Sequence, residues 1–187
     1  MRSFKTEGII IKRLNYKDAD RILTIFTKEH GKIAVKAAGV RKITSRRSSH
    51  IELFNHTGMT LYQSTTGFPV LTEAVVIDHF SPIKKNLETI GHAYHLCELV
   101  NGLCPEQQEN YAVFALLKKT LAALAQRIEA TSEELRKIIH TFEIELLSIL
   151  GYWHKSEVVP ATMDVSAFIE DIMERKLRSK AIFSKLS

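Results

Sequence analysis

Residues 32–38 read KIAVKAA, a stretch in which apolar and basic side chains alternate. The apolar members of one face are Ile33, Val35 and Ala37, and the other face carries Lys32 and Lys36. Successive side chains of a β-strand point to opposite faces, so this alternation predicts a strand with one buried face. It is the clearest indication that the chain begins with a β-sheet.

The segments on either side of this stretch also have strand patterns, and short loops join them. Three consecutive isoleucines and later β-branched runs predict five strands, at residues 7–13, 19–27, 32–38, 50–63 and 70–77. The loop at 28–31 ends in glycine, as a hairpin requires. No connection is long and periodic enough for a crossover helix, which disfavours a parallel α/β sheet. Five strands in about 80 residues indicate a small antiparallel barrel of the OB type, and an SH3-like barrel satisfies the same pattern.

The apolar spacing changes to a helical one after Pro82, a residue that suits the first position of a helix. Four apolar stripes with helical spacing follow, and Thr131 with Glu134 forms a capping-box pattern. The sequence therefore predicts an α+β chain. We expect a five-stranded antiparallel OB-fold barrel at residues 1–80 and an all-α helical domain at residues 81–187.

Composition excludes several classes of protein. The chain has 187 residues, 45% of them hydrophobic and 25% charged, which is typical of a globular protein. No apolar run approaches the ~20 residues that span a bilayer, and the first residues lack the apolar stretch of a signal peptide. Two cysteines are too few for a disulfide scaffold or a four-cysteine zinc site. We therefore expect a cytoplasmic protein that does not bind membranes.

The net charge of +5 is unevenly distributed. Residues 1–50 hold 13 Lys and Arg against 4 Asp and Glu, residues 51–171 hold 8 against 16, and residues 172–187 hold 5 against 1. A basic first segment of this kind indicates a polyanion as partner. The alternative is a basic surface that is simply solvated.

The sequence carries none of the common catalytic motifs. No glycine pattern forms a phosphate-binding loop, and no nucleophile elbow or zinc-protease helix is present. Asp18 and Asp20, or His92 and His95, have spacings that could share a metal, but neither pair has further ligands nearby. Loop acids paired with neighbouring cations, and packed or solvated histidines, are the favoured interpretations. We expect no catalytic residues, no cofactor and no metal.

The best candidate for a binding site is residues 32–47, which hold six positive charges and no acid. Lys and Arg make charged contacts with phosphate, and the interleaved Ser and Thr hydroxyls can add neutral ones. Few aromatic residues remain outside the barrel core for base stacking, so we expect salt-sensitive binding with weak sequence preference. The predicted phosphate contacts are Lys12, Arg13, Arg21, Lys32, Lys36, Arg41, Lys42, Arg46 and Arg47.

Several short motifs follow one another along the chain. They are EGIIIK at 7–12, YxxADRILT at 16–24, TKEHGK at 27–32, AGVRK at 38–42, SR at 45–46, LTEA at 71–74, LGY at 150–152 and KLRSK at 176–180. Their order and spacing over nearly the whole chain resemble the RecO family of bacterial recombination mediators.

The resemblance implies binding to single- and double-stranded DNA and annealing of complementary strands in DNA repair, which would place the protein at the nucleoid. It implies work with RecR to load RecA onto DNA coated by single-strand-binding protein, and contact between the helical domain and the acidic-hydrophobic tail of that protein. Many relatives carry a four-cysteine zinc module after the LGY motif, whereas residues 153–163 here hold no cysteine. We therefore expect no zinc.

Three other interpretations stay open from the residues alone. They are an OB-type RNA-binding or annealing module, a small hydrolase or metal enzyme, and a protein-interaction scaffold whose basic head binds an acidic protein.

Overall fold

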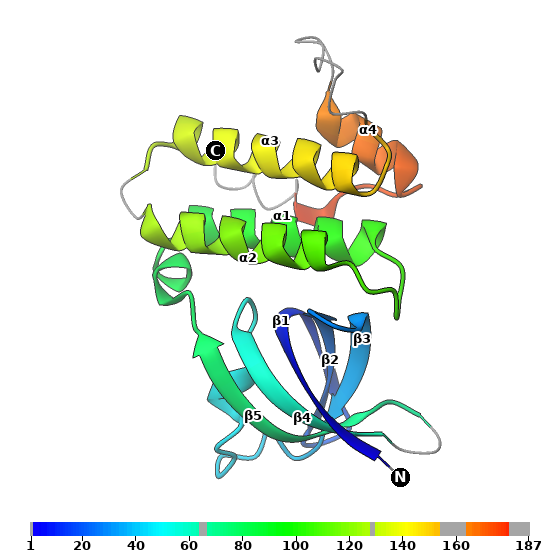
Figure 1. Cartoon of the computed structure of the whole chain (residues 1–187). Helices are drawn as coiled ribbons and strands as arrows, with labels where there is room; N and C mark the ends of the chain where they lie inside the picture. Colours follow the sequence, from blue (N-terminus) through cyan, green and yellow to red (C-terminus); the bar gives the residue numbers. More distant parts are fainter. Residues whose placement is uncertain (1, 64–66, 128–129, 154–163, 180–187) are drawn as a thin grey trace. The chain divides into compact units, whose positions relative to one another are not determined.

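The computed structural model describes residues 2–63, 67–127, 130–153 and 164–179 (Figure 1). The chain forms two compact units, Met1–Phe80 with Cys104–Phe114, and Ser81–Leu103 with Ala115–Ser187. The first unit thus takes in a segment that lies between two helices in the sequence. The domain limits 1–80 and 81–187 stay a prediction.

The first unit contains the five strands that the sequence predicts. Their bounds are β1 (Arg2–Tyr16), β2 (Asp20–Thr27), β3 (Gly31–Ala37), β4 (His56–Gln63) and β5 (Val70–Asp78). The strands close into a ring in the order β1-β2-β3-β5-β4 (Figure 1). Among the described residues, every pairing of these strands is antiparallel except the one that closes the ring, where β3 and β5 are parallel and pair through Lys36 and Val70. A five-stranded, partly open barrel of this kind is typical of the OB fold.

The alternating face of β3 builds the barrel core as predicted. Ile33 is 9% exposed, and Val35 and Ala37 are fully buried. They pack in one cluster with apolar residues from the other strands, among them Ile10, Leu23, Ile25, Leu61 and Leu71. Removing these side chains from water supplies the main force that holds the strands in register.

The predicted strand at residues 50–63 is wrong in its first part. Ser48–Ile51 form a short 3-10 helix (η1), and β4 starts only at His56. The Asn55 side chain donates to the Ser49 carbonyl at 3.0 Å, and the Thr57 hydroxyl donates to the His50 carbonyl at 2.7 Å. These side chains satisfy backbone carbonyls that a strand would pair with a neighbour, and so keep this stretch out of the sheet.

The second unit contains α1 (Leu87–Leu103), most of α2 (Tyr111–Gln126), α3 (Ser132–Ile149) and α4 (Val165–Ile172). A 3-10 helix, η2 (Ser81–Lys85), comes first, so the α-helix expected from Pro82 onward starts later, after Asn86. The Asn86 carboxamide caps α1 by accepting the N–H of Glu88 at 2.8 Å. No helix among the described residues has the length and apolar character needed to cross a membrane.

The predicted capping box at the start of α3 is confirmed. Thr131 Oγ1 accepts the N–H of Glu134 at 3.3 Å, and Glu134 Oε2 accepts the N–H of Thr131 at 2.9 Å. These bonds satisfy two of the backbone donors that an uncapped helix start leaves without partners.

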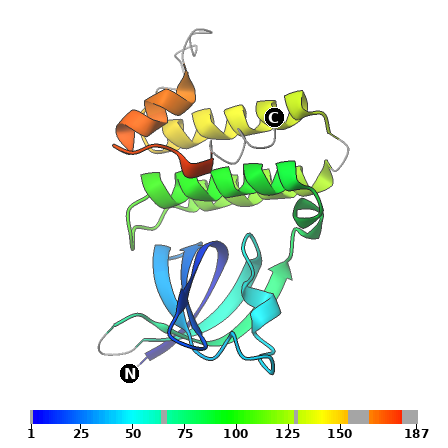
Figure 2. The same ribbon diagram turned by 180° about the vertical axis from the view of Figure 1, so that it is seen from behind.

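The end of the described chain, the red segment in Figure 2, is held by acidic side chains of the same unit. Glu98 on α1 accepts the N–H groups of Arg178 and Ser179, both at 2.9 Å. Glu170 on α4 accepts the N–H of Leu177 at 3.0 Å. Burial alone would raise the pKa of Glu98, but the two N–H donors hold it below its ordinary value.

Residues 104–109, here called the strap, run beside the start of β3 within the first unit. The N–H of Gln107 donates to the Lys32 carbonyl at 2.9 Å, and Glu106 pairs with Lys32 in a parallel bridge. Gly31 has a φ of +61°, and a Cβ atom there would lie 1.9 Å from the Gln108 carbonyl oxygen. Glycine is therefore needed at position 31 for two reasons: it allows the positive φ of the hairpin loop, and it leaves room for the backbone of the strap.

We expect Gly31→Ala to lower the free energy of unfolding by about 2 kcal/mol or more, because it adds a backbone clash to the strain of positive φ. Urea denaturation measures the loss. Gly67→Ala is the matched control, since Gly67 has a φ of +86° but nothing within 4 Å of the added Cβ. Equal losses in the two variants would contradict a role for the contact with Gln108.

Candidate nucleic-acid interface

The loop that follows β3, residues 38–47, is here called the basic loop and lies against the turn between β1 and β2. The N–H of Arg41 donates to the Ala19 carbonyl at 2.9 Å, and Arg41 Nη1 donates to the Lys17 carbonyl at 3.2 Å. The N–H of Gly39 donates to Asp20 Oδ1 at 2.8 Å. The basic loop is thereby fixed against the turn that carries Lys17.

Three predicted contacts of the basic loop, Arg41, Lys42 and Arg46, are exposed. Lys12 on β1 is exposed as well, and so is Lys17 in the adjoining turn. None of the carboxylates among the described residues forms an ion pair with these five side chains within 4 Å. Their charge is therefore available to an anion in solution.

Tyr16 lies among these cations and was missed in the sequence analysis. Its ring is 42% exposed, with Lys17 Nζ at 5.5 Å and Lys36 Nζ at 5.9 Å from the ring centroid. Ile43 at the tip of the basic loop is also fully exposed. An exposed ring beside ammonium groups can stack on a base while the cations bind the neighbouring phosphates. The signal in the sequence was the tyrosine of the YxxADR motif.

Lys36 is oriented by Asp20, to which its Nζ lies 3.2 Å from Oδ2. The N–H of Gly39 and the Lys36 ammonium both stabilise the ionised carboxylate and lower the pKa of Asp20. The expected ion pair of Asp20 with Lys17 or Arg21, its neighbours in the sequence, is wrong: Asp20 pairs with Lys36 on β3, and Arg21 pairs with Glu52. Among the residues that the structure describes, no group of three or more His, Cys, Asp or Glu could hold a metal ion.

Arg13 and Arg21 share one carboxylate. Arg13 forms an ion pair with Glu52 Oε2, and Arg21 Nη1 lies 3.4 Å from Glu52 Oε1. Both arginines are half-buried. Two guanidinium groups around a single carboxylate have a net charge of about +1. Arg13 and Arg21 can therefore still attract phosphate through this charge, although their donors are engaged by Glu52.

Lys32, one of the predicted phosphate contacts, is buried, and Arg47 has a different role from the other arginines of the basic loop. Lys32 is 8% exposed because the strap covers the start of β3. Arg47 donates from Nη1 to the Leu71 carbonyl at 2.7 Å and from Nη2 to the Ala38 carbonyl at 3.0 Å. Arg47 therefore holds the basic loop in place and has few donors left for phosphate.

His92 and His95, considered above as metal ligands, are buried in the second unit. His95 Nε2 lies 2.7 Å from Glu143 Oε1, and its Nδ1 lies 2.8 Å from Ser179 Oγ. All three groups are at most 5% exposed, so the arrangement serves packing rather than chemistry on a substrate. The prediction of a packed histidine is confirmed for His95.

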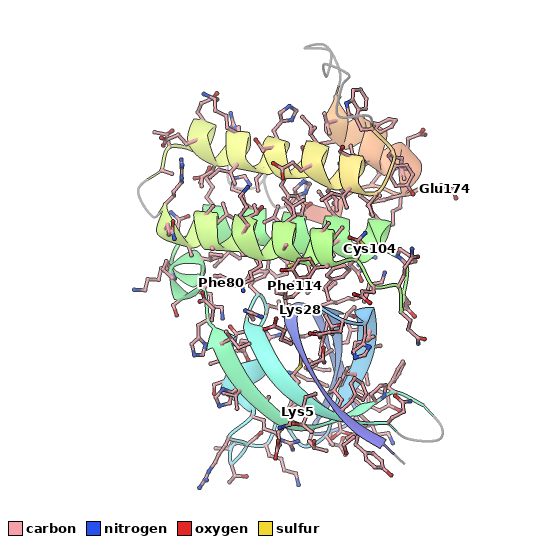
Figure 3. All side chains as sticks on the ribbon, viewed as in Figure 1. Lys5, Lys28, Phe80, Cys104, Phe114 and Glu174 are labelled. Carbon is pink, nitrogen blue, oxygen red and sulfur yellow. The ribbon has the colours of Figure 1, made fainter. Side chains whose placement is uncertain are left out.

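The two cysteines, Cys97 on α1 and Cys104 at the start of the strap (labelled in Figure 3), are buried free thiols. Burial raises the pKa of Cys97, and it raises the pKa of Cys104 to about 11 despite the nearby Lys32. Both thiols therefore remain protonated near neutral pH. The prediction of no zinc also depended on the missing cysteines of residues 153–163, of which 154–163 lie outside the described residues.

Comparison with known proteins identifies the family. The model for the N-terminal part of recombination protein O matches residues 1–80, and the model for its C-terminal part matches residues 84–153. The chain belongs to the RecO family. The two matches correspond to the barrel strands and to most of the helices.

Several curated relatives carry the name DNA repair protein RecO. That of Roseiflexus sp. is 39% identical over 153 residues, which are 81% of this chain and 51% of the relative. That of Symbiobacterium thermophilum is 30% identical over 152 residues, which are 81% of this chain and 58% of the relative. That of Dehalococcoides mccartyi is 36% identical over 149 residues, which are 80% of this chain and 56% of the relative. The chain thus matches just over half the length of these relatives.

We expect the stability that Asp20 contributes to depend on pH. Its pKa is lower in the folded protein than in the unfolded chain, so the contribution is present above the unfolded value of about 3.9 and disappears as pH falls through the folded value. The difference in unfolding free energy between the wild type and Asp20→Asn should be largest near neutral pH and should shrink below about pH 4. A difference that stays constant from pH 7 to pH 2.5 would contradict this prediction.

Proposed function

We propose that this RecO-family chain binds single- and double-stranded DNA and anneals complementary strands during recombinational repair, in the cytoplasm at the nucleoid. The observation that carries the proposal is the group of exposed cations in the basic loop and the β1–β2 turn, Lys17, Arg41, Lys42 and Arg46, with Lys12 also exposed on β1. Hydrogen bonds from the loop backbone to the β1–β2 turn hold the group together. Kinship with proteins named for DNA repair supports the same conclusion.

Annealing needs no bond to be made or broken, and hence no catalytic residue. Two DNA strands repel each other through their phosphates, and this repulsion slows their pairing. Cations that bind phosphate release condensed counterions and reduce the repulsion, so the strands meet more often. Because the contacts are mainly to phosphates, the base edges stay free to find their complements.

We expect the triple variant Arg41→Glu, Lys42→Glu, Arg46→Glu to bind oligonucleotides at least about 100-fold more weakly, since three attractions become repulsions. The slope of log affinity against log salt should fall by about 3. Fluorescence anisotropy measures both, and the rate of annealing should fall in parallel. Arg47 is left unchanged because it holds the loop.

The matched control carries the same change of charge at exposed positions outside the basic loop, Lys85→Glu, Lys118→Glu and Arg136→Glu. Equal losses in the two triple variants would reject the interface. Parallel titrations with RNA and DNA of the same sequence separate the DNA proposal from the RNA-annealing alternative. Equal or stronger annealing of RNA would favour that alternative.

For the protein partners, we propose RecR, RecA indirectly, and the acidic tail of single-strand-binding protein. A groove of about 300 Å³ between α2 and α3 has the chemistry that such a tail needs. Its apolar lining includes Leu116, Ile138 and Phe142, and its cations include Lys119 and Lys137. Of the acids in the groove, Glu134 already accepts bonds from the helix cap. An apolar floor with a cationic rim fits an acidic peptide that ends in apolar residues.

We expect Lys119→Glu with Lys137→Glu to weaken binding of the synthetic tail peptide about tenfold or more, because both changes place repulsion at the rim. Lys118→Glu with Arg136→Glu is the control, on the same two helices but outside the groove. Calorimetric titration of the peptide measures the affinity. If the control pair loses as much affinity as the test pair, the groove is not the binding site.

A further inference from the structure

The closure of the barrel leaves part of the β3 edge open. Across the seam between β3 and β5, the described residues pair only at Lys36 and Val70, where the N–H of Lys36 donates to the Pro69 carbonyl at 2.8 Å. At the start of β3, the Lys32 carbonyl accepts the N–H of Gln107. The backbone groups of Lys32 and Lys36 therefore point into the seam and away from β2.

Ala34 lies midway between these two residues. Because backbone groups of a strand alternate sides at every residue, the N–H and C=O of Ala34 point into the same seam. Neither the bridge to the strap nor the pair with β5 reaches Ala34 in the described chain. An open donor and acceptor on a sheet edge is the feature that an extended peptide uses to add a strand.

A cavity of about 630 Å³ lies beside this edge. Its apolar wall includes Phe4, Ile33 and Phe68, and Phe68 is 52% exposed. The Phe4 ring packs edge-on against His30, with the ring centroids 5.0 Å apart. A peptide that pairs with Ala34 would thus find room for an apolar side chain next to its backbone contact.

The charges around the cavity select the kind of peptide. Glu29, Glu106 and Glu109 line it and are exposed, whereas Lys32 is the one Lys or Arg in the described lining and is buried. The Thr6 hydroxyl donates to Glu29 Oε2 at 2.6 Å, which fixes the position of this carboxylate at the edge of the cavity. Three carboxylates repel phosphate chains and acidic peptides and attract Lys and Arg.

We propose that the seam between β3 and β5 binds an extended basic segment of a partner protein by strand addition. One residue of the segment pairs with the backbone of Ala34, an apolar side chain enters the cavity, and flanking Lys or Arg residues face Glu29, Glu106 and Glu109. This site uses the opposite charge from the DNA interface and does not depend on it.

The probe is a fluorescein-labelled peptide, acetyl-KRVFVKR-amide, added to the full chain. Two control peptides separate the contributions: acetyl-EEVFVEE-amide reverses the flanking charge, and a backbone N-methylated form of the basic peptide loses its central N–H donors. We expect the basic peptide to bind at least about tenfold more tightly than either control. Comparable binding of the N-methylated form would overturn strand addition.

A charge-reversal pair on the strap, Glu106→Lys with Glu109→Lys, should weaken the basic peptide about tenfold. Glu73→Lys with Glu133→Lys, at exposed sites outside the cavity, should change its affinity less than about twofold. Both pairs concern exposed side chains, so folding is checked simply by thermal unfolding. Equal effects of the two pairs would overturn the proposed site.

Amide hydrogen exchange locates the contact directly. The Ala34 amide should exchange quickly in the free protein and at least about tenfold more slowly with the basic peptide bound. Protection of Ala34 by a short oligothymidylate instead of the basic peptide would overturn the proposal in favour of a nucleobase pocket. Failure of DNA binding at the basic loop would leave these measurements unaffected.

Discussion

Repulsion between the like charges of residues 32–47, in β3 and the basic loop, is the constraint on which the arrangement of the basic loop depends. Six cations in 16 residues oppose any compact arrangement unless acceptors are nearby. The chain supplies them itself: Asp20 for Lys36, and two backbone carbonyls for Arg47. With these cations compensated internally, the loop can be ordered while Arg41, Lys42 and Arg46 remain exposed. A few internal contacts thus position charges that are left for another molecule.

Local features of the fold were predictable because neighbouring residues determine them. The alternation in β3 and the capping box of Thr131 and Glu134 need only a few positions to be recognised, and both are confirmed. The strap on β3 and the 3-10 helix at Ser48–Ile51 were missed, because they depend on bonds from Gln107, Asn55 and Thr57 to distant or unexpected carbonyls. The spacing of apolar residues along the sequence gives no indication of such bonds.

In the candidate interface, too, local features were predictable from the sequence and those that depend on distant contacts were not. Composition was enough to find the basic loop, yet Arg46 and Arg47 are adjacent arginines with opposite environments. The difference arises because Arg47 donates to the carbonyl groups of Ala38 and Leu71, which the closed sheet brings close together, and so has a structural role. Lys32 was misassigned because the segment that covers it lies about 75 residues further along the chain. Tyr16 was overlooked because an aromatic residue in a strand is usually core.

The capture of the last described residues by α1 has a consequence for biosynthesis. His95 and Ser179 are 84 positions apart, and Glu98 accepts the N–H groups of Arg178 and Ser179. The ribosome releases α1 long before residues 178 and 179 are synthesised, so the polar groups of that helix stay hydrated until then. The barrel strands, by contrast, are all synthesised within the first 78 residues. The strands can therefore pair during translation before the helical unit can acquire its contacts with residues 178 and 179.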